Sequence, residues 1–161
     1  MSDVFELVLN LNLRDDLTDA ELASLRWFLG LGVRPENLSI LAESPIAIVD
    51  GGEESRPVLA GRGAAWKTGG ALVSELVRRG NPAGWAITSR QELHPDEFDE
   101  VLALLSWLAD RADYPYRDHD GTVRSGGCGN VVGYLRFYED VDPTVLTIRG
   151  GIISWPSEYL G

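Results

Sequence analysis

The chain has 161 residues, of which 44% are hydrophobic and 24% are charged. These proportions are ordinary for a globular protein and exclude a disordered or collagen-like chain. No apolar run approaches the roughly 18 residues of a membrane span, and a single cysteine excludes an internal disulfide framework. We therefore expect one domain over residues 1–161.

The formal net charge is −11, from 14 basic and 25 acidic residues. Such a charge repels phosphate backbones and anionic lipids, so we expect neither a nucleic acid nor a membrane as a partner. The amino terminus lacks the basic region and the long apolar stretch that a secretory signal requires. Together with the lone Cys128, this predicts a cytoplasmic protein.

The first two elements follow from short-range patterns. Residues 5–13 alternate between two sets of side chains with a period of two, which predicts a strand. Thr18 and Glu21 then have the spacing of a capping box, and apolar residues at helical spacing run from Leu22 to Leu29. We therefore expect a strand followed by a helix that begins after Thr18 and ends at a nearby glycine.

A second strand and helix follow about 80 residues later along the chain. Residues 84–91 predict the strand, and residues 94–97 (His-Pro-Asp-Glu) predict the start of the helix. Proline and acidic residues both suit the first turn of a helix. An apolar stripe from Phe98 to Leu108 continues the helix, which we expect to end near residues 110–112.

Two further segments are typical of β-hairpins. Residues 131–138 lead through a polar turn into residues 145–149, and both segments predict strands. Residues 71–79 lead through a second turn into the strand at 84–91. The apolar spacing of 71–79 also fits a helix, so both interpretations stay open for that segment.

The order strand, helix, hairpin, helix, hairpin predicts an α+β fold with the split βαβ arrangement of ferredoxin-like proteins. In this arrangement two helices cover one face of a mainly antiparallel sheet, and residues 145–149 extend its edge. Residues 31–69 are a long insert, in which 46–49 and 57–60 are candidates for a small hairpin. Whether this insert covers the open face of the sheet is not determined by the pattern.

The uncovered face of the predicted sheet gathers polar side chains that suit ligand binding. Strand alternation places seven of them on that face: Asn10, Asn12, Arg90, Tyr134, Arg136, Tyr138 and Arg149. Arginine binds carboxylates and phosphates, and tyrosine offers a stacking surface. Three arginines lying close together repel one another unless an anion or an acidic side chain such as Glu6 lies between them. We predict that this face binds an anionic small molecule or an acidic segment of a protein partner; the alternative is a solvated face, or one covered by the insert or a second subunit.

No motif identifies a catalytic residue, a metal site or a cofactor. Residues 61–68 differ from a phosphate-binding loop because Trp66 stands where that motif needs glycine, so we expect an ordinary flexible loop. Cys128 follows His119 by nine residues in a glycine-rich region. These two side chains would form a nucleophilic pair only if they touch in the folded protein.

We therefore expect a small acidic cytoplasmic protein that acts by binding, as a ligand-binding or inhibitor or immunity-type protein, rather than as an enzyme. The alternative is a small-molecule enzyme that uses the open sheet face or the loop holding Cys128 and His119. A third interpretation is a homodimer joined through the sheet faces.

Overall fold

The computed structural model describes residues 3–40, 56–113 and 130–159, together with the backbone of four short strands outside these ranges. Those strands are β2 (Ile48–Val49), β3 (Glu53–Glu54), β7 (Tyr116–Arg117) and β8 (Val123–Arg124). β2 pairs with β3 and β7 pairs with β8, both antiparallel. The predicted pair of His119 and Cys128 lies outside the described residues.

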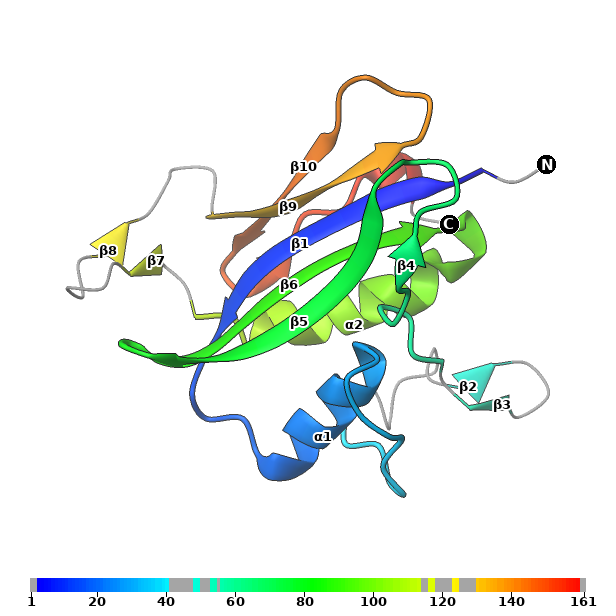
Figure 1. The fold of residues 1–161 in the computed structure, drawn as a ribbon. Coiled ribbons are helices and arrows are strands. Elements are labelled where there is room, and N and C mark those ends of the chain that lie inside the picture. Colours follow the sequence, from blue (N-terminus) through cyan, green and yellow to red (C-terminus); the bar gives the residue numbers. More distant parts are fainter. Residues whose placement is uncertain are drawn as a thin grey trace.

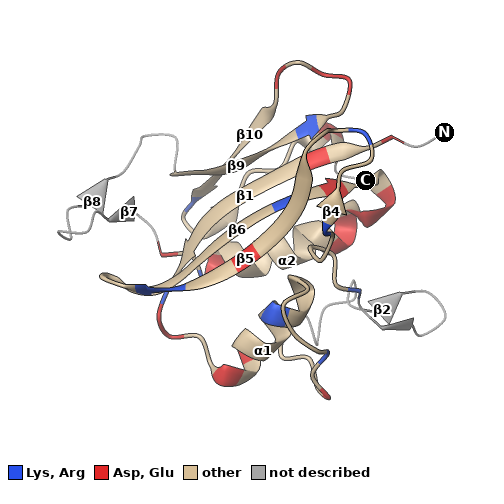
Figure 2. Ribbon diagram, viewed as in Figure 1, with Lys and Arg blue, Asp and Glu red and all other residues tan. Residues whose placement is uncertain are grey.

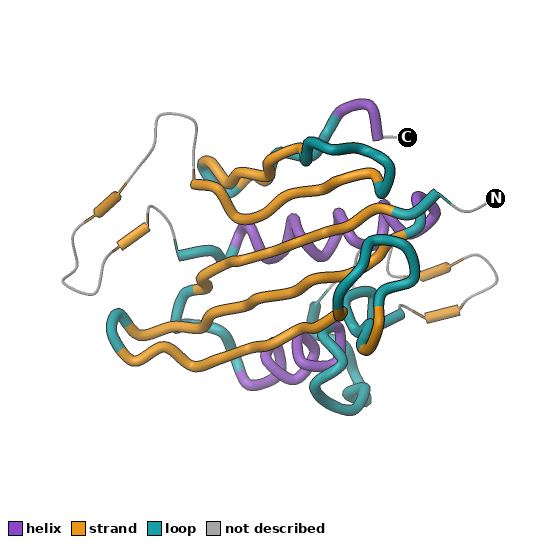
Figure 3. The backbone as a smooth tube through the Cα atoms, turned by 45° about the horizontal axis from the view of Figure 1, so that its top comes forward, coloured by secondary structure: helices purple, strands orange, loops and turns teal. Residues whose placement is uncertain are grey.

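Seven of the described strands form one open antiparallel sheet, and two helices lie against one of its faces (Figure 1, Figure 3). The strands are β1 (Phe5–Leu13), β4 (Gly63–Ala64), β5 (Ala71–Gly80), β6 (Ala83–Leu93), β9 (Asn130–Phe137), β10 (Thr144–Arg149) and β11 (Ile152–Ile153). Their order across the sheet is β11-β10-β9-β1-β6-β5-β4. The helical segments are α1 (Asp19–Phe28), η2 (Pro95–Glu97), α2 (Phe98–Asp110) and η3 (Ser157–Tyr159). The mixed α+β class and the antiparallel sheet agree with the sequence-based expectation.

Helix α1 begins with the predicted capping box. The hydroxyl of Thr18 accepts a hydrogen bond from the N–H of Glu21 at 3.1 Å, and the Glu21 carboxylate accepts one from the N–H of Thr18 at 3.0 Å. These bonds satisfy two backbone donors that the first turn would otherwise leave free. No helix in the described ranges is long and apolar enough to cross a membrane.

The period-two pattern of β1 divides its side chains between the core and the open face. Leu7, Leu9 and Leu13 are completely buried, whereas Asn10 is exposed. The buried residues of β1 belong to one hydrophobic cluster with those of α1 and α2. Because alternate residues of a strand face opposite sides, the helices therefore cover the face of β1 that carries the leucines.

Replacing Leu9 by alanine is expected to lower the free energy of unfolding by about 2–5 kcal/mol, because it leaves a cavity at a position with no solvent exposure. Urea denaturation measures this change. The neighbouring substitution Asn10→Ala, on the exposed face, should change stability by about 0.5 kcal/mol or less. Equal effects at the two positions would contradict the assignment of faces.

The insert at 31–69 differs from the expected hairpin in its second strand. β2 pairs with β3 at residues 53–54 and not with residues 57–60. Residues 57–60 instead form a turn that buries Leu59 completely and lets its N–H donate to the carbonyl of Phe28 at 3.0 Å. Burial of one leucine against the end of α1 therefore decides the shape of this segment, and no short-range pattern indicates such a contact.

Candidate functional site

The face of the sheet opposite the helices, which we call the open face, carries exposed aliphatic side chains from four strands. No described helix lies on this side of the sheet (Figure 3). The exposed aliphatic residues, assigned to this face by the strand registers, are Val73, Val77, Val131, Val145 and Ile152. Polar side chains lie among them, including Asn10, Asn12 and Thr88. A face of this composition is typical of surfaces that bind another molecule.

Near one end of the open face, the carboxylate of Glu6 lies between two of the predicted arginines. Nε of Arg90 donates to Oε2 of Glu6 at 2.8 Å, and Nε of Arg136 donates to Oε1 at 3.0 Å. The Glu6 side chain is 7% exposed. The structure therefore brings Arg90 and Arg136 together as predicted, with an acidic side chain of the chain itself between them.

Further donors of these arginines are also used within the chain. Arg90 donates to the carbonyl of Ala71 at 3.0 Å and to the hydroxyl of Thr68 at 3.2 Å. Arg136 donates to the carbonyl of Asp140 at 2.8 Å. An anionic ligand would have to displace these contacts, so the geometry favours a structural role for both guanidinium groups.

Three other predicted residues lie on or beside the same face. Tyr134 is next to Glu6, and burial followed by the negative charge of Glu6 raises the pKa of Tyr134. Asn10 accepts a hydrogen bond from the hydroxyl of Thr88 at 3.1 Å. Tyr138 follows the end of β9, and its hydroxyl donates to Glu139 at 2.9 Å. That these residues bind a ligand stays a prediction.

Arg149 does not lie near Arg136, contrary to the expectation that the three arginines converge. β10 runs antiparallel to β9, with Thr144 opposite Leu135 and Ile148 opposite Asn130. This register places Arg149 at the other end of the hairpin, about 20 Å from Arg136 along the strand. The alternation of side chains predicted the shared face, but only the antiparallel register determines the distance along it.

The loop between β4 and β5, residues 65–70, passes over one end of the open face, and we call it the strap (Figure 1). The N–H groups of Trp66, Lys67 and Thr68 all donate to the carboxylate of Glu92, at 2.5, 2.7 and 2.9 Å. Successive N–H groups that converge in this way form an anion-binding nest. The prediction of an ordinary flexible loop is therefore wrong here, because the nest is closed around a carboxylate of the chain.

The side chain of the chain's single lysine connects the strap to the residue that follows β9. Nζ of Lys67 lies 4.8 Å from the ring centroid of Trp66 and 4.5 Å from that of Tyr138. Both distances fit cation–π contacts. Because Tyr138 follows β9 whereas the strap follows β4, the described part of the insert covers one end of the open face and leaves the aliphatic residues exposed.

The carboxyl of Glu92 has opposing influences on its pKa. Burial raises the pKa. The hydrogen bonds from the backbone of Trp66, Lys67 and Thr68 and from the Thr68 hydroxyl together lower it by more than burial raises it, so the pKa lies below the ordinary value of 4.5. A carboxyl with a lowered pKa stabilises the fold above its unfolded-state pKa. That stabilisation is lost as the pH falls through the folded-state pKa.

Glu92→Gln is therefore expected to lower stability at pH 7 and to flatten the fall in stability below about pH 4.5. Unfolding free energies measured by urea titration between pH 7 and pH 3 test this. Thr68→Ala removes the hydroxyl bond to Glu92 at 3.1 Å and the contact of the same hydroxyl with Arg90 at 3.2 Å, but keeps the three backbone bonds to Glu92, so it should flatten the pH dependence less than Glu92→Gln does. Parallel pH curves for wild type and Glu92→Gln would contradict the strap contact.

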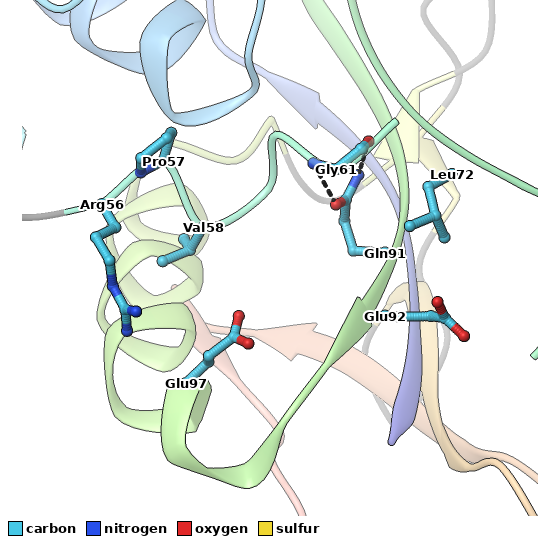
Figure 4. Close-up of a pocket in the computed structure, with 8 residues that line it drawn as sticks. All are labelled: Arg56, Pro57, Val58, Gly61, Leu72, Gln91, Glu92 and Glu97. Atoms are coloured by element: carbon cyan, nitrogen blue, oxygen red, sulfur yellow. Dashed lines mark hydrogen bonds between the residues drawn. The ribbon is translucent and has the colours of Figure 1, made fainter. Parts of the chain in front are cut away.

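A cleft of about 360 Å³ lies between the insert, the end of β6 and the start of α2 (Figure 4). It is lined by Arg56, Pro57, Val58, Gly61, Leu72, Gln91, Glu92 and Glu97. A smaller cavity of about 190 Å³, beside Trp66, shares Glu92 and Glu97 with it. Gln91 closes one wall, because its amide exchanges two hydrogen bonds with the backbone of Gly61 at 2.8 and 3.1 Å. The cleft is thus a preformed space of small-molecule size.

Glu97 is the acidic group that faces this cleft. Burial raises the pKa of Glu97, and the nearby Glu100 adds to the increase. Neighbouring carboxyls with opposite pKa shifts are a feature of general acid–base sites. The Glu92 carboxylate, however, points away from Glu97 toward the strap, which occupies its oxygens (Figure 4). The two carboxyls therefore do not face one another across the cleft.

Sequence reasoning missed both of these glutamates as site residues. The sequence accounts for Glu97 as a first-turn acid, and Glu97 does cap the helix start, where its carboxylate accepts from the N–H of His94 at 3.4 Å. Among the described residues, no three His, Cys, Asp or Glu side chains lie close enough together to hold a metal ion. No protein-family model matches the chain, and neither a curated protein sequence nor a solved structure matches it.

Proposed function

We propose that this protein acts by binding a protein partner that carries a basic surface, with the open face as the contact surface. The observation that supports this proposal is the set of exposed aliphatic side chains on the open face, which come from β5 on one side and from β9, β10 and β11 on the other. These aliphatic side chains lie on either side of the polar side chains of β1 and β6, and exposed apolar groups of this kind mark interaction surfaces. The proposal makes the chain an inhibitor or immunity-type protein rather than an enzyme.

The strand order supports a ferredoxin-like frame for this surface. β9-β1-β6-β5, with helices after β1 and β6, is the order expected for a split βαβ unit. β10 and β11 extend this unit on one side, and β4 extends it on the other. Because both helices lie on one side, the frame leaves a broad sheet face available for a partner. We place the protein in the cytoplasm as a single domain, consistent with its one cysteine.

The basic character of the partner is inferred from charge. Acidic residues gather at the end of the molecule where β1 begins and β6 and β9 end, and Figure 2 shows them at the start of α2 and in the turn after β9. They are Asp3, Glu92, Asp96, Glu97, Asp99, Glu100, Glu139, Asp140, Asp142 and Glu158. With a net charge of −11 for the chain, this acidic end speeds encounter with a basic partner and disfavours an acidic one.

The test compares two substitutions of exposed valines by glutamate. Val145→Glu alters an exposed position of the open face on β10, whereas the control Val33→Glu alters an exposed position in the segment after α1. Proteins captured from a cell extract by wild type and by the control, but not by Val145→Glu, are then purified. The binding of each is measured by calorimetry at low and high salt.

We expect a basic partner whose affinity falls at least about tenfold, or about 1.4 kcal/mol, with Val145→Glu. The affinity should be unchanged with Val33→Glu and should weaken as salt is raised. Hydrogen exchange should slow in β9 and β10 in the complex. A partner that slows hydrogen exchange in the helices instead, or whose affinity is unchanged by Val145→Glu, would contradict the proposal.

An enzyme remains the second candidate, and the cleft at Glu97 is the observation that favours it. A preformed cleft with a carboxyl of raised pKa is typical of general acid sites. Titration of a library of small metabolites, followed by amide NMR shifts, tests this candidate. Shifts confined to the residues around Glu97 and lost in Glu97→Gln would favour the enzyme over the binding protein.

A further inference from the structure

The edge of the sheet formed by β5 is paired along only part of its length. β4 pairs with the first two residues of β5, with Gly63 opposite Leu72 and Ala64 opposite Ala71. Beyond this point, the carbonyl of Ser74 accepts from the side chain of Arg62 at 3.3 Å. Among the described residues, no strand pairs with the outer edge of residues 75–80. A free edge of this length is able to pair with another strand.

The backbone groups that point out from this edge are those of the even-numbered residues. The N–H of Ala65 donates to the carbonyl of Gly70 at 2.8 Å across the paired part of the edge. In an antiparallel strand, every second residue directs both its N–H and its C=O to the same side. The contact of Ser74 with Arg62 agrees with this alternation. Leu76 and Arg78 are therefore the residues that offer ladder hydrogen bonds to a further strand.

The odd-numbered residues of the same segment present their side chains on the open face. Glu75 is exposed and lies opposite Thr88 of β6. Val77 is 56% exposed. Arg79 is half-buried, and its guanidinium makes a contact of 3.4 Å with Asp113. Along the edge, Glu75 and Arg79 therefore lie on either side of the exposed Val77.

We propose that this edge binds a second copy of the chain, with the two β5 strands antiparallel about a two-fold axis at Val77. In this register Glu75 of each copy lies opposite Arg79 of the other copy, and the two Val77 side chains meet at the centre. The outward groups of Leu76 then face those of Arg78 in the second copy, as an antiparallel ladder requires. The two seven-stranded sheets become one continuous sheet across the axis.

Charge excludes the neighbouring symmetric registers. An axis at Glu75, Arg78 or Arg79 would place identical charges directly opposite one another, which destabilises a strand pair. An axis at Leu76 would place Glu75 opposite Val77 and would form no ion pair. The Val77 axis alone among residues 75–79 gives two opposite-charge pairs, each a favourable cross-strand contact. The contact surface of this dimer is the β5 edge, so it leaves Val145, at the opposite side of the sheet, available to a partner.

The test is a charge exchange between two variants. Sedimentation equilibrium of the wild type from about 1 µM to about 1 mM, a range that covers weak interfaces, should show a reversible monomer–dimer equilibrium. Glu75→Arg and Arg79→Glu should each weaken self-association at least about tenfold, because each places like charges at both cross-strand pairs. An equimolar mixture of the two variants should dimerise again, because every pair in the mixed dimer is then one acid and one base.

Matched controls separate this result from loss of folding and from net charge. Asp142→Arg changes the net charge by the same amount as Glu75→Arg, at an exposed turn residue away from β5. It should leave the dimer unchanged. Thermal unfolding identifies any variant that fails to fold. If Arg79→Glu does so because it faces Asp113, the double substitution Arg79→Glu with Asp113→Asn removes that repulsion and takes its place in the mixture.

Each outcome of the test either supports or overturns the proposed dimer. A monomer at every concentration would show that the charged side chains protect the edge from pairing, and would overturn the proposal. A dimer that persists in Glu75→Arg but is lost in Val145→Glu would place the contact on the open face and would also overturn it. Loss with Glu75→Arg and recovery in the mixture supports it, whatever partner the open face binds.

Discussion

Glu6→Ala is expected to lower the free energy of unfolding by about 3–5 kcal/mol, because it removes the one carboxylate between two partly buried guanidinium groups. Arg90 and Arg136 each direct Nε at this carboxylate, at 2.8 and 3.0 Å. Without it, their positive charges would repel one another across β1 in a setting that is poorly hydrated. The cost should therefore exceed that of an ordinary exposed ion pair, which is typically below about 1 kcal/mol.

Chemical denaturation of three variants tests this expectation. Glu6→Gln keeps the shape and one acceptor but removes the charge, so its loss of stability should be intermediate. Glu75→Ala removes an exposed carboxylate from the same face and should cost about 0.5 kcal/mol or less. If Glu6→Ala costs no more than Glu75→Ala, the two arginines are not held by Glu6 in solution. They would then be available for the anionic ligand predicted from the sequence.

Gly133→Ala is expected to cost about 3 kcal/mol or more, or to prevent folding, because β9 and β1 approach too closely for a side chain at this point. A Cβ on Gly133 would lie 1.8 Å from the carbonyl oxygen of Val8 and 2.8 Å from its carbonyl carbon. Both are backbone atoms in the middle of β1, so relief requires the two strands to separate. The irregular pairing of β9 with β10 beside Gly133, between Leu146 and Thr147, shows the local departure from a regular ladder.

The matched control is Gly80→Ala, at the end of β5, where an added Cβ has no neighbouring atom within 4 Å. It should change stability by about 0.5 kcal/mol or less. Circular dichroism, the urea midpoint and amide dispersion in NMR spectra distinguish a destabilised fold from an unfolded chain. Equal midpoints for Gly133→Ala and Gly80→Ala would mean that the strands separate at little cost.

The sequence by itself predicted the elements that depend on neighbouring residues. The alternation in residues 5–13 predicted β1 because a two-residue period is set by the strand geometry alone. Thr18 with Glu21 predicted the start of α1, and the stripe from Phe98 to Leu108 predicted α2, because caps and helical stripes involve residues three or four apart. These short-range signals also predicted the side of the sheet on which Glu6 lies.

The tertiary structure alone decided which side chains meet. The sequence of residues 71–79 is compatible with a helix or a strand, and pairing with β6 along most of this segment makes it part of β5. The same long-range pairing brings Glu6 between Arg90 and Arg136 and carries Arg149 to the far end of its hairpin. The nest around Glu92 joins residues about 25 positions apart. Such contacts depend on register and on loop closure, to which no local pattern is sensitive.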